Sequence, residues 1–349
     1  MAVTFTGTKL PQSQLAEIQR ELYQDSATFR EGIIDIQEGH KSGTDVYESK
    51  VAVTFSAATT AAVTATGNID TKVNKTPVSL DRIMVADQID EATLLDTRFE
   101  RSMAAGAFNL VSQEYDNAVL VDITPAIGEG MENLCWNGAT TAQKVAIAAL
   151  TPGAPQGSIS AGAQTLVAAM PVNLSNSLPA TILYNYSQAK TTPGAGLGDY
   201  QKVLTIAAVT SATIAAEYGK LYATIPSKVL DNKIVGQECV IFAPLGHRQL
   251  MKIANNSVGA ASNQNFLFTG VGANEVCTYN GIVVKFVPLV GFMIAANPKY
   301  LKILMDLTSD MSSLETGQVA NGAQARWYKN VQAFATWVTN QRYITLYGG

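Results

Sequence analysis

The sequence predicts a mixed α+β fold, because the spacing of its hydrophobic residues changes along the chain. From Val46 to Ala86 apolar and polar side chains alternate, which is the period of a β-strand. From Asp90 to Gly138 the apolar residues recur every three or four positions, as on one face of a helix. After residue 151, short apolar runs bounded by glycine and proline surround one clear helical segment. We therefore expect helices and strands in the same chain.

The composition favours contact with other subunits. Of the 349 residues, 15% are charged, against roughly 25% in ordinary globular proteins. A surface so low in charge suits burial against further protein. The net charge is -4 and Lys and Arg do not cluster, so we expect no tight binding of nucleic acid and only weak, non-specific contact with it.

The cysteines and the N-terminal residues indicate folding in a reducing compartment. Cys135, Cys239 and Cys277 are far apart in apolar surroundings, so neither a disulfide framework nor a zinc site is expected. The first 22 residues lack the pattern of a signal peptide, and no uncharged segment is apolar enough to predict a membrane span.

Residues 1–45 are expected to form an extended arm that carries one helix. Leu15, Ile18 and Leu22 share one face of that helix, and the segment from Gly39 to Thr44 breaks it. An amphipathic helix without a core of its own packs on something else. These three residues are therefore candidates for contact between subunits.

Residues 46–88 are expected to form a long β-hairpin. Val51, Val53 and Phe55 alternate with small or polar residues, Gly67-Asn68 predicts a turn, and a return strand follows near residues 71–78. A hairpin of such weak apolar content is not stable alone, so we expect it to lie along the rest of the protein or a neighbour. Its candidate contact residues are Val51, Val53, Phe55, Lys72 and Lys75.

The stretch from Asp90 to Gly138 predicts a broken helix, which we call the spine. Thr124 is a suitable N-cap and Pro125 a suitable first residue for its second half, and Asn137-Gly138 predicts its end. Acidic residues favour the N-terminus of a helix through its dipole. We therefore expect Asp87, Asp90, Glu91 and Asp96 at the start of the spine.

The rest of the chain predicts mostly strands. The expected helices are residues 211–226 and 247–254. The expected strands are residues 164–169, 181–184, 239–244, 276–279, 282–287, 292–295, 302–307, 326–338 and 343–347. Asn280-Gly281 is the strongest hairpin signal in the chain.

Residues suited to catalysis are few, so the chain is not expected to be an enzyme or to bind a cofactor or metal. His40 lies in a polar turn and His247 at a helix start, where both are expected at the surface or as caps. Cys239 lies in an apolar strand, where a thiol is inert. The glycine run from Gly194 to Gly198 follows Thr192-Pro193 instead of a strand, which indicates a loop and not a phosphate site.

Several passages resemble one family of viral proteins. They are Met131–Gly138 (MENLCWNG), Tyr218–Lys228 (YGKLYATIPSK), Cys239–Leu250 (CVIFAPLGHRQL) and Phe292–Asp306 (FMIAANPKYLKILMD). Together with the order of elements, they resemble the major capsid proteins of tailed bacteriophages, which share the Hong Kong 97 fold.

This resemblance implies a domain organisation. Residues 1–45 correspond to an N-terminal arm and 46–88 to an extended loop that lies over a neighbouring subunit. Residues 89–150 and 306–338 correspond to a peripheral domain that contains the spine helix, and residues 151–305 and 339–349 to an axial domain. Some members crosslink a lysine of this loop to an asparagine of a neighbour. No partner is evident for Lys72 or Lys75, so we expect no crosslink.

The resemblance also implies a function. Copies of the chain would assemble in the host cytoplasm into the hexamers and pentamers of an icosahedral virion capsid around a double-stranded DNA genome. Portal, scaffold and, in some members, decoration proteins would be further partners. The alternatives are the shell of an encapsulin-like nanocompartment on the same fold, and a surface-layer or adhesin-like β protein, which the Thr/Asn/Gly-rich composition supports.

Overall fold

The computed structural model describes fourteen parts of the chain, and every structural statement concerns these residues. They are 7–9, 28, 33–41, 43–53, 69–90, 126–149, 161–191, 209–230, 239–257, 266–270, 275–306, 314–318, 325–339 and 341–348. The chain divides into two compact units. Unit 1 consists of Met1–Lys41, Leu80–Cys135 and Ile303–Ala335, and unit 2 of Ser42–Ser79, Trp136–Lys302 and Thr336–Gly349. The arm, extended loop, peripheral domain and axial domain are defined by their places in a shell, so their boundaries stay predictions.

One sheet of six strands is built around the long strand β13. Its members are β1 (Gly7–Lys9), β2 (Asp35–Gln37), β5 (Asp81–Asp90), β11 (Leu301–Met305), β12 (Leu314–Gln318) and β13 (Ala325–Val338). The order is β1-β12-β13-β11-β2, and β5 also pairs with β13. Alternate residues of β13, from Tyr328 to Phe334, are buried, as the period of a strand with one covered face requires. The strand predicted at 326–338 is thereby confirmed.

Strand β5 corrects the expected start of the spine. Asp87 and Asp90 lie in β5, opposite Tyr328 and Ala325, and not at a helix N-terminus. The reason is that ten consecutive residues of β5 pair with β13, and this ladder outweighs the weak preference of carboxylates for a helix dipole. Glu91 and Asp96, like the rest of the first half of the spine, lie outside the described residues.

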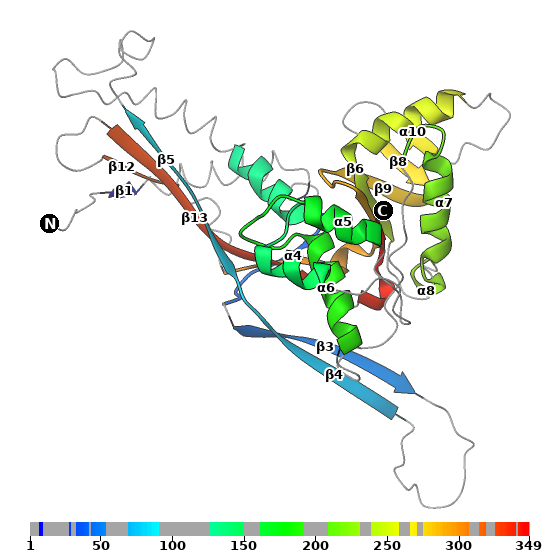
Figure 1. Ribbon diagram of the computed structural model, residues 1–349, viewed down its shortest axis with the longest axis horizontal. Helices are drawn as coiled ribbons and strands as arrows, with labels where there is room; N and C mark the ends of the chain where they lie inside the picture. Colours follow the sequence, from blue (N-terminus) through cyan, green and yellow to red (C-terminus); the bar gives the residue numbers. More distant parts are fainter. Residues whose placement is uncertain are drawn as a thin grey trace, which may run out of the picture. The chain divides into compact units, whose positions relative to one another are not determined.

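Strands β3 (Thr44–Val53) and β4 (Ile69–Val78) form the predicted hairpin as a two-stranded sheet (Figure 1). They pair antiparallel over ten positions, from Thr44 opposite Val78 to Val53 opposite Ile69. The predicted turn at Gly67-Asn68 lies outside the described residues. The segment 46–88 therefore contributes to two sheets. Strands β3 and β4 pair with each other, and β5 pairs with β13.

The second half of the spine is helical, as predicted, over residues 126–136. Ile127, Met131 and Cys135 are buried, at the spacing of one helix face. The helix ends at Gly138, whose φ of 99° is accessible to glycine and unfavourable for other residues.

The second sheet forms the core of unit 2. Its six strands follow the order β14-β10-β6-β9-β8-β7, with β6 and β9 parallel. Asn280 and Gly281 both have positive φ between β8 and β9, which is the turn that their sequence predicts. The bounds are β6 (Val240–Pro244), β7 (Phe266–Thr269), β8 (Val276–Tyr279), β9 (Ile282–Val287), β10 (Phe292–Ala296) and β14 (Thr345–Gly348).

Helices cover both faces of this second sheet. On one face α7 (Ile214–Thr224) and α10 (Leu245–Ser257) pack with Ile241 and Ala243 of β6 in one buried cluster. Phe242 points to the opposite face, because neighbouring strand residues alternate. There its ring lies 5.4 Å from that of Trp136, between centroids.

Four further helices are described in unit 2, and two of them replace expected strands. They are α4 (Thr141–Ala148), α5 (Ala161–Ala169), α6 (Leu178–Thr191) and α8 (Ser227–Leu230), with single 3-10 turns at Pro298–Tyr300 and Gln341–Tyr343. Residues 164–169 and 181–184 were expected to be strands and are helical. Pro179 lies in the first turn of α6, where proline favours a helix. The Nζ of Lys144 donates to the carbonyl of Ala168 at 3.0 Å, which satisfies one of the last carbonyls of α5.

Candidate assembly site

The β3/β4 hairpin places four of the eight predicted contact residues. Val51 lies opposite Thr71, Val53 opposite Ile69, Lys72 opposite Lys50 and Lys75 opposite Tyr47. Val51 and Lys72 therefore occupy neighbouring steps of one ladder. Phe55, Leu15, Ile18 and Leu22 lie outside the described residues, so the structure neither tests their role nor brings them to the hairpin.

The N-terminal segment contacts other parts of unit 1 through β1 and through Thr28. Strand β1 pairs antiparallel with residues 315–317 of β12. The backbone N–H of Thr28 donates to Oε1 of Glu132 at 3.0 Å, and the hydroxyl of Thr28 donates to the same oxygen. Both side chains are buried. A buried carboxylate needs such donors, so this contact fixes the segment to the helix 126–136.

The Thr28–Glu132 contact was not predicted from the sequence. The two residues are 104 positions apart, and neither belongs to a recognisable motif. Glu132 lies one position from Met131, beside the apolar face of a predicted helix. That position alone does not indicate a partner 104 residues away.

Three consecutive residues of unit 2, Trp136-Asn137-Gly138, lie at the end of this helix; we call them the helix-end turn. Asn137 Nδ2 donates to the carbonyl of Pro288, and Asn137 Oδ1 accepts the N–H of Val290 at 3.1 Å. The loop before β10 is therefore held by one buried amide side chain. Sequence reasoning identified the helix end here, but not the contact with a loop 150 residues later.

Gly138 is required at this turn for a second reason besides its φ angle. A Cβ atom on Gly138 would lie 1.9 Å from Nδ2 of Asn173. That nitrogen donates to the carbonyl of Asn137 at 2.7 Å, so moving it away would break a hydrogen bond of the same turn. The turn therefore tolerates no side chain without rearrangement.

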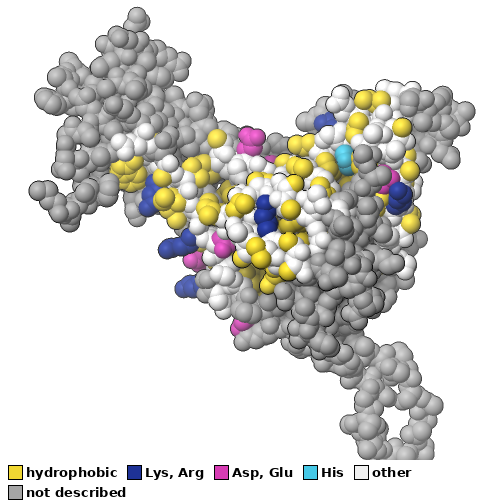
Figure 2. Space-filling view, viewed as in Figure 1, with side chains coloured by type: hydrophobic (Ala, Val, Ile, Leu, Met, Phe, Trp, Pro, Cys, Tyr) yellow, Lys and Arg dark blue, Asp and Glu magenta, His cyan; other side chains and the backbone are white. Residues whose placement is uncertain are grey.

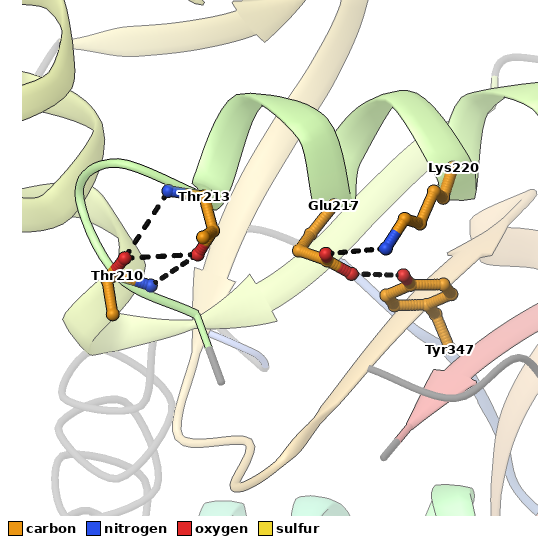
Figure 3. Close-up of polar contacts among 5 residues, drawn as sticks. All are labelled: Thr210, Thr213, Glu217, Lys220 and Tyr347. Atoms are coloured by element: carbon orange, nitrogen blue, oxygen red, sulfur yellow. Dashed lines mark hydrogen bonds and ion pairs between the residues drawn. The ribbon is translucent and has the colours of Figure 1, made fainter. Parts of the chain in front are cut away.

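A buried carboxylate connects α7 to the C-terminal strand β14 (Figure 3). Glu217 Oε1 accepts from Nζ of Lys220 at 2.7 Å, and Glu217 Oε2 accepts from the hydroxyl of Tyr347. Burial, together with the hydrogen bond to Glu217 and its negative charge, raises the pKa of Tyr347. Figure 3 also shows Thr210 and Thr213, which bond each other at the start of α7. The hydrogen bond between Tyr347 and Glu217 therefore fixes β14 to α7.

His247 is buried in the core, which corrects the expectation of a surface or capping residue. Its Nδ1 lies 3.2 Å from the hydroxyl of Tyr218, and 9% of the residue is exposed. Burial lowers the pKa of His247 to about 4, so the ring is neutral at pH 7. The helix α10 begins two residues earlier, and Leu245 and Arg248 of its first turn are exposed, whereas His247 contacts Tyr218 of α7.

The cysteines are buried and free, as expected. Burial raises the pKa of Cys239 to about 12, so its thiol is protonated at pH 7 and is a weak nucleophile. In the part of the chain that the structure describes, no three His, Cys, Asp or Glu side chains are grouped to hold a metal ion. No described helix is both long enough and apolar enough to cross a membrane.

Exposed apolar side chains gather near the helix-end turn. Val172 and Leu174 flank Asn173, Val290 follows the loop held by Asn137, and Val145 lies on α4; all four are more than half exposed. In the space-filling view, apolar atoms spread over α4 and α5 among few charges (Figure 2). A surface of this kind suits contact with further protein.

Comparisons with known proteins give structural similarity without sequence similarity. No family model matches the chain, and no curated protein matches it. The procapsid of satellite phage P4, with its size determination protein, aligns at a TM-score of 0.45 and 11% identity over 95% of this chain and 98% of that chain. The capsid of the myovirus phage XM1 aligns at 0.46 and 12% identity over 92% and 91%. The SrpI encapsulin of Synechococcus elongatus PCC 7942 aligns at 0.46 and 8% identity over 99% and 91%. Phage capsids and an encapsulin are thus among the structures that this chain resembles.

Proposed function

We propose that this chain is the subunit of a protein shell, and that its copies form the hexamers and pentamers of an icosahedral capsid around a double-stranded DNA phage genome. The observation that carries the proposal is the hairpin of β3 and β4, which forms a sheet of two ten-residue strands. A two-stranded sheet is marginally stable in water, so a hairpin of this length calls for a supporting surface. In a shell, a neighbouring copy supplies it.

The composition and the N-terminal segment support the same role. A chain with 15% charged residues covers its surface best by contact with further protein. Thr28 and β1 each contact parts of unit 1 that are distant in sequence. In this proposal Val51, Val53, Phe55, Lys72 and Lys75 of the loop, and Leu15, Ile18 and Leu22 of the arm, contact neighbouring copies.

The other parts of the proposal follow from the shell role. The chain acts without catalysis and without a cofactor or metal. It contacts packaged DNA weakly, because its net charge is -4. Portal, scaffold and decoration proteins are its further partners, assembly takes place in the host cytoplasm, and the product is the virion capsid.

The decisive experiment is expression of the full chain, followed by electron microscopy and analytical ultracentrifugation. We expect closed particles and separate capsomers. A monomer under all assembly conditions, with scaffold included, would contradict the proposal. Nuclease-protected DNA inside particles from infected cells would support a genome shell, and an enzyme cargo would indicate a nanocompartment.

A hairpin variant tests the carrying observation. Residues 46–76 can be replaced by Asn-Gly, because Thr44 and Val78 are paired neighbours at the base of the hairpin. We expect this variant to remain folded by circular dichroism and to form no particles. The matched control is Ile253→Ser on α10, which changes an exposed residue elsewhere in unit 2. Normal particles from the hairpin variant would remove the main support for the proposal.

A further inference from the structure

We propose that strand β5 is a docking edge for a second copy of this chain, which adds its own β5 antiparallel across a two-fold axis near Val85. The inference deepens the proposed function by naming one surface through which copies meet. It rests on that function only in taking another copy as the partner.

Strand β5 lies at an edge of the described part of its sheet. All ten residues of β5 pair with β13, which runs beside it (Figure 1). Among the described strands β13 is its one partner, so the other side of β5 is an edge of that part of the sheet. A sheet edge presents N–H and C=O groups in the pattern that a further strand needs.

Large apolar side chains are exposed at the middle of β5. Met84 is 57% exposed and Val85 is 48% exposed, and their neighbours Arg82 and Ala86 are exposed as well. Successive residues of a strand point to opposite faces. Large apolar groups are therefore open on both faces at the same point of one strand.

The middle of β5 contains no lysine, proline or β-bulge that would hinder a further strand from pairing with it. Natural sheet edges are usually protected by charged side chains, by proline or by a β-bulge. Arg82 and Asp87 flank the middle of β5, but residues 83–86 themselves read Ile-Met-Val-Ala, and their pairing with β13 continues without a bulge. The β4 strand differs, because it contains Lys72, Lys75 and Pro77. The middle of β5 therefore favours pairing with another strand.

The sequence of β5 suits pairing with β5 of a second copy. In an antiparallel pair centred on Val85, this residue lies opposite its own copy, Met84 lies opposite Ala86, and Arg82 lies opposite Gln88. Apolar pairs then occupy the centre, and no like charges are opposed from residue 82 to residue 88. Parallel pairing in register would place Arg82 opposite Arg82. Ile83 then lies opposite Asp87. Of these two pairings, the antiparallel one avoids opposing like charges, and it gives a closed two-fold contact.

The expected strength follows from the size of the contact. Seven paired residues span about 24 Å, which is small for an interface that holds two proteins together alone. The contact is therefore weak between free subunits, and it gains strength where other contacts already hold the copies near one another.

Disulfide trapping with Val85→Cys in the full chain tests the inference. Residues opposite one another have Cα atoms about 4.5–5.5 Å apart, which a disulfide can span. The native cysteines are buried, so they contribute little background. The matched control is Ile253→Cys on α10, which is 46% exposed and lies outside β5. We expect Val85→Cys to give at least about five times more disulfide dimer than the control on a non-reducing gel under assembly conditions.

Further outcomes separate this inference from the proposed function. Equal dimer from both variants, or a disulfide from Val85→Cys to a different protein, would overturn the two-fold contact. Particles of the unmodified chain by electron microscopy, with no excess dimer, would leave the shell role standing and refute the contact. Excess dimer without any particles would do the opposite. Val85→Lys should reduce particle yield several-fold while the thermal unfolding temperature stays unchanged.

Discussion

Strand β6 and the middle of strand β5, residues 83–86, are both apolar, but their surroundings differ. Ile241, Phe242 and Ala243 of β6 are fully buried, with helices on one face and Trp136 on the other. Met84 and Val85 of β5 are about half exposed on both faces. Apolar content therefore does not tell which strand a chain covers by itself and which it leaves for a partner. The predictions below test that difference, from the largest effect on stability to the smallest.

The largest loss is expected for Trp136→Ala in the covered sheet. Trp136 is fully buried against Phe242, and deleting a large buried ring costs about 3–5 kcal/mol. Urea unfolding monitored by circular dichroism measures the change. The matched change in the open strand, Met84→Ala, should cost less than about 0.5 kcal/mol. Similar losses for both variants would show that β5 is covered within the subunit.

Gly138→Ala should come next, with a loss of about 2–3 kcal/mol. The positive φ becomes strained, and the new Cβ displaces Asn173 from the carbonyl of Asn137. The control is Gly130→Ala in the helix before it, where a Cβ meets nothing within 4 Å. That change should be neutral or slightly stabilising. The free energy of unfolding of both variants decides, and a harmless Gly138→Ala would refute the role given to this turn.

Tyr347→Phe should destabilise unit 2 by about 1.5–3 kcal/mol, because it removes a hydrogen bond to a buried charged group. Lys220 is the other partner of Glu217, but half of its side chain is exposed. Lys220→Ala should therefore cost less than about 1 kcal/mol. Thermal unfolding of the two variants tests this ranking, and a reversed order would contradict it.

Acid should weaken the covered region through His247. The pKa of His247 is about 4 in the folded chain against 6.5 for an ordinary histidine, so the unfolded state binds its proton first as the pH falls. This contribution to stability is complete above pH 6.5, and it is lost progressively down to pH 4, by at most about 3 kcal/mol. We expect His247→Gln to flatten the pH dependence of urea unfolding between these values. Parallel curves for both proteins would show that His247 does not titrate there.

The smallest effect is expected at a surface cluster of one carboxylate and two cations. Glu275 accepts from Lys252 and Arg248, and these hydrogen bonds lower its pKa. About half of each cationic side chain is exposed, so salt screens the cluster. Glu275→Gln should slightly lower the unfolding temperature at low ionic strength, and the difference should vanish at high salt. A difference that persists at high salt would assign this cluster a larger structural role.

Local signals in the sequence predicted the elements that depend on local physics. Asn280-Gly281 specified a tight hairpin, since both residues adopt positive φ without strain. The helix 126–136 followed from its cap and its apolar spacing, and the buried strand β6 from its uninterrupted apolar residues. Each of these signals lies within about ten residues.

The errors arose where two local signals conflicted or where the partner was distant in sequence. Residues 164–169 are short, apolar and flanked by glycine, so period alone does not distinguish helix from strand. Asp87 and Asp90 were assigned to a helix start because the pairing of β5 with β13 joins residues more than 230 positions apart. His247 and Tyr218 meet only after α7 and α10 pack together. Of the candidate contact residues, the four on the hairpin lie on the strands that the pattern predicted, and their contacts with a neighbour stay predictions.

The pairing of β1 with β12 has a consequence for the time course of synthesis. The first residues of β1 leave the ribosome long before their partner, which follows about 300 residues later and, at about 5–20 residues per second, on the order of 15–60 seconds later. The hairpin of β3 and β4 closes within a few seconds on the same scale, since its strands are joined by residues 54–68. Strand β1 therefore passes most of the synthesis of its own chain before its native partner exists. During that interval its edge has to stay unpaired or pair with something other than β12.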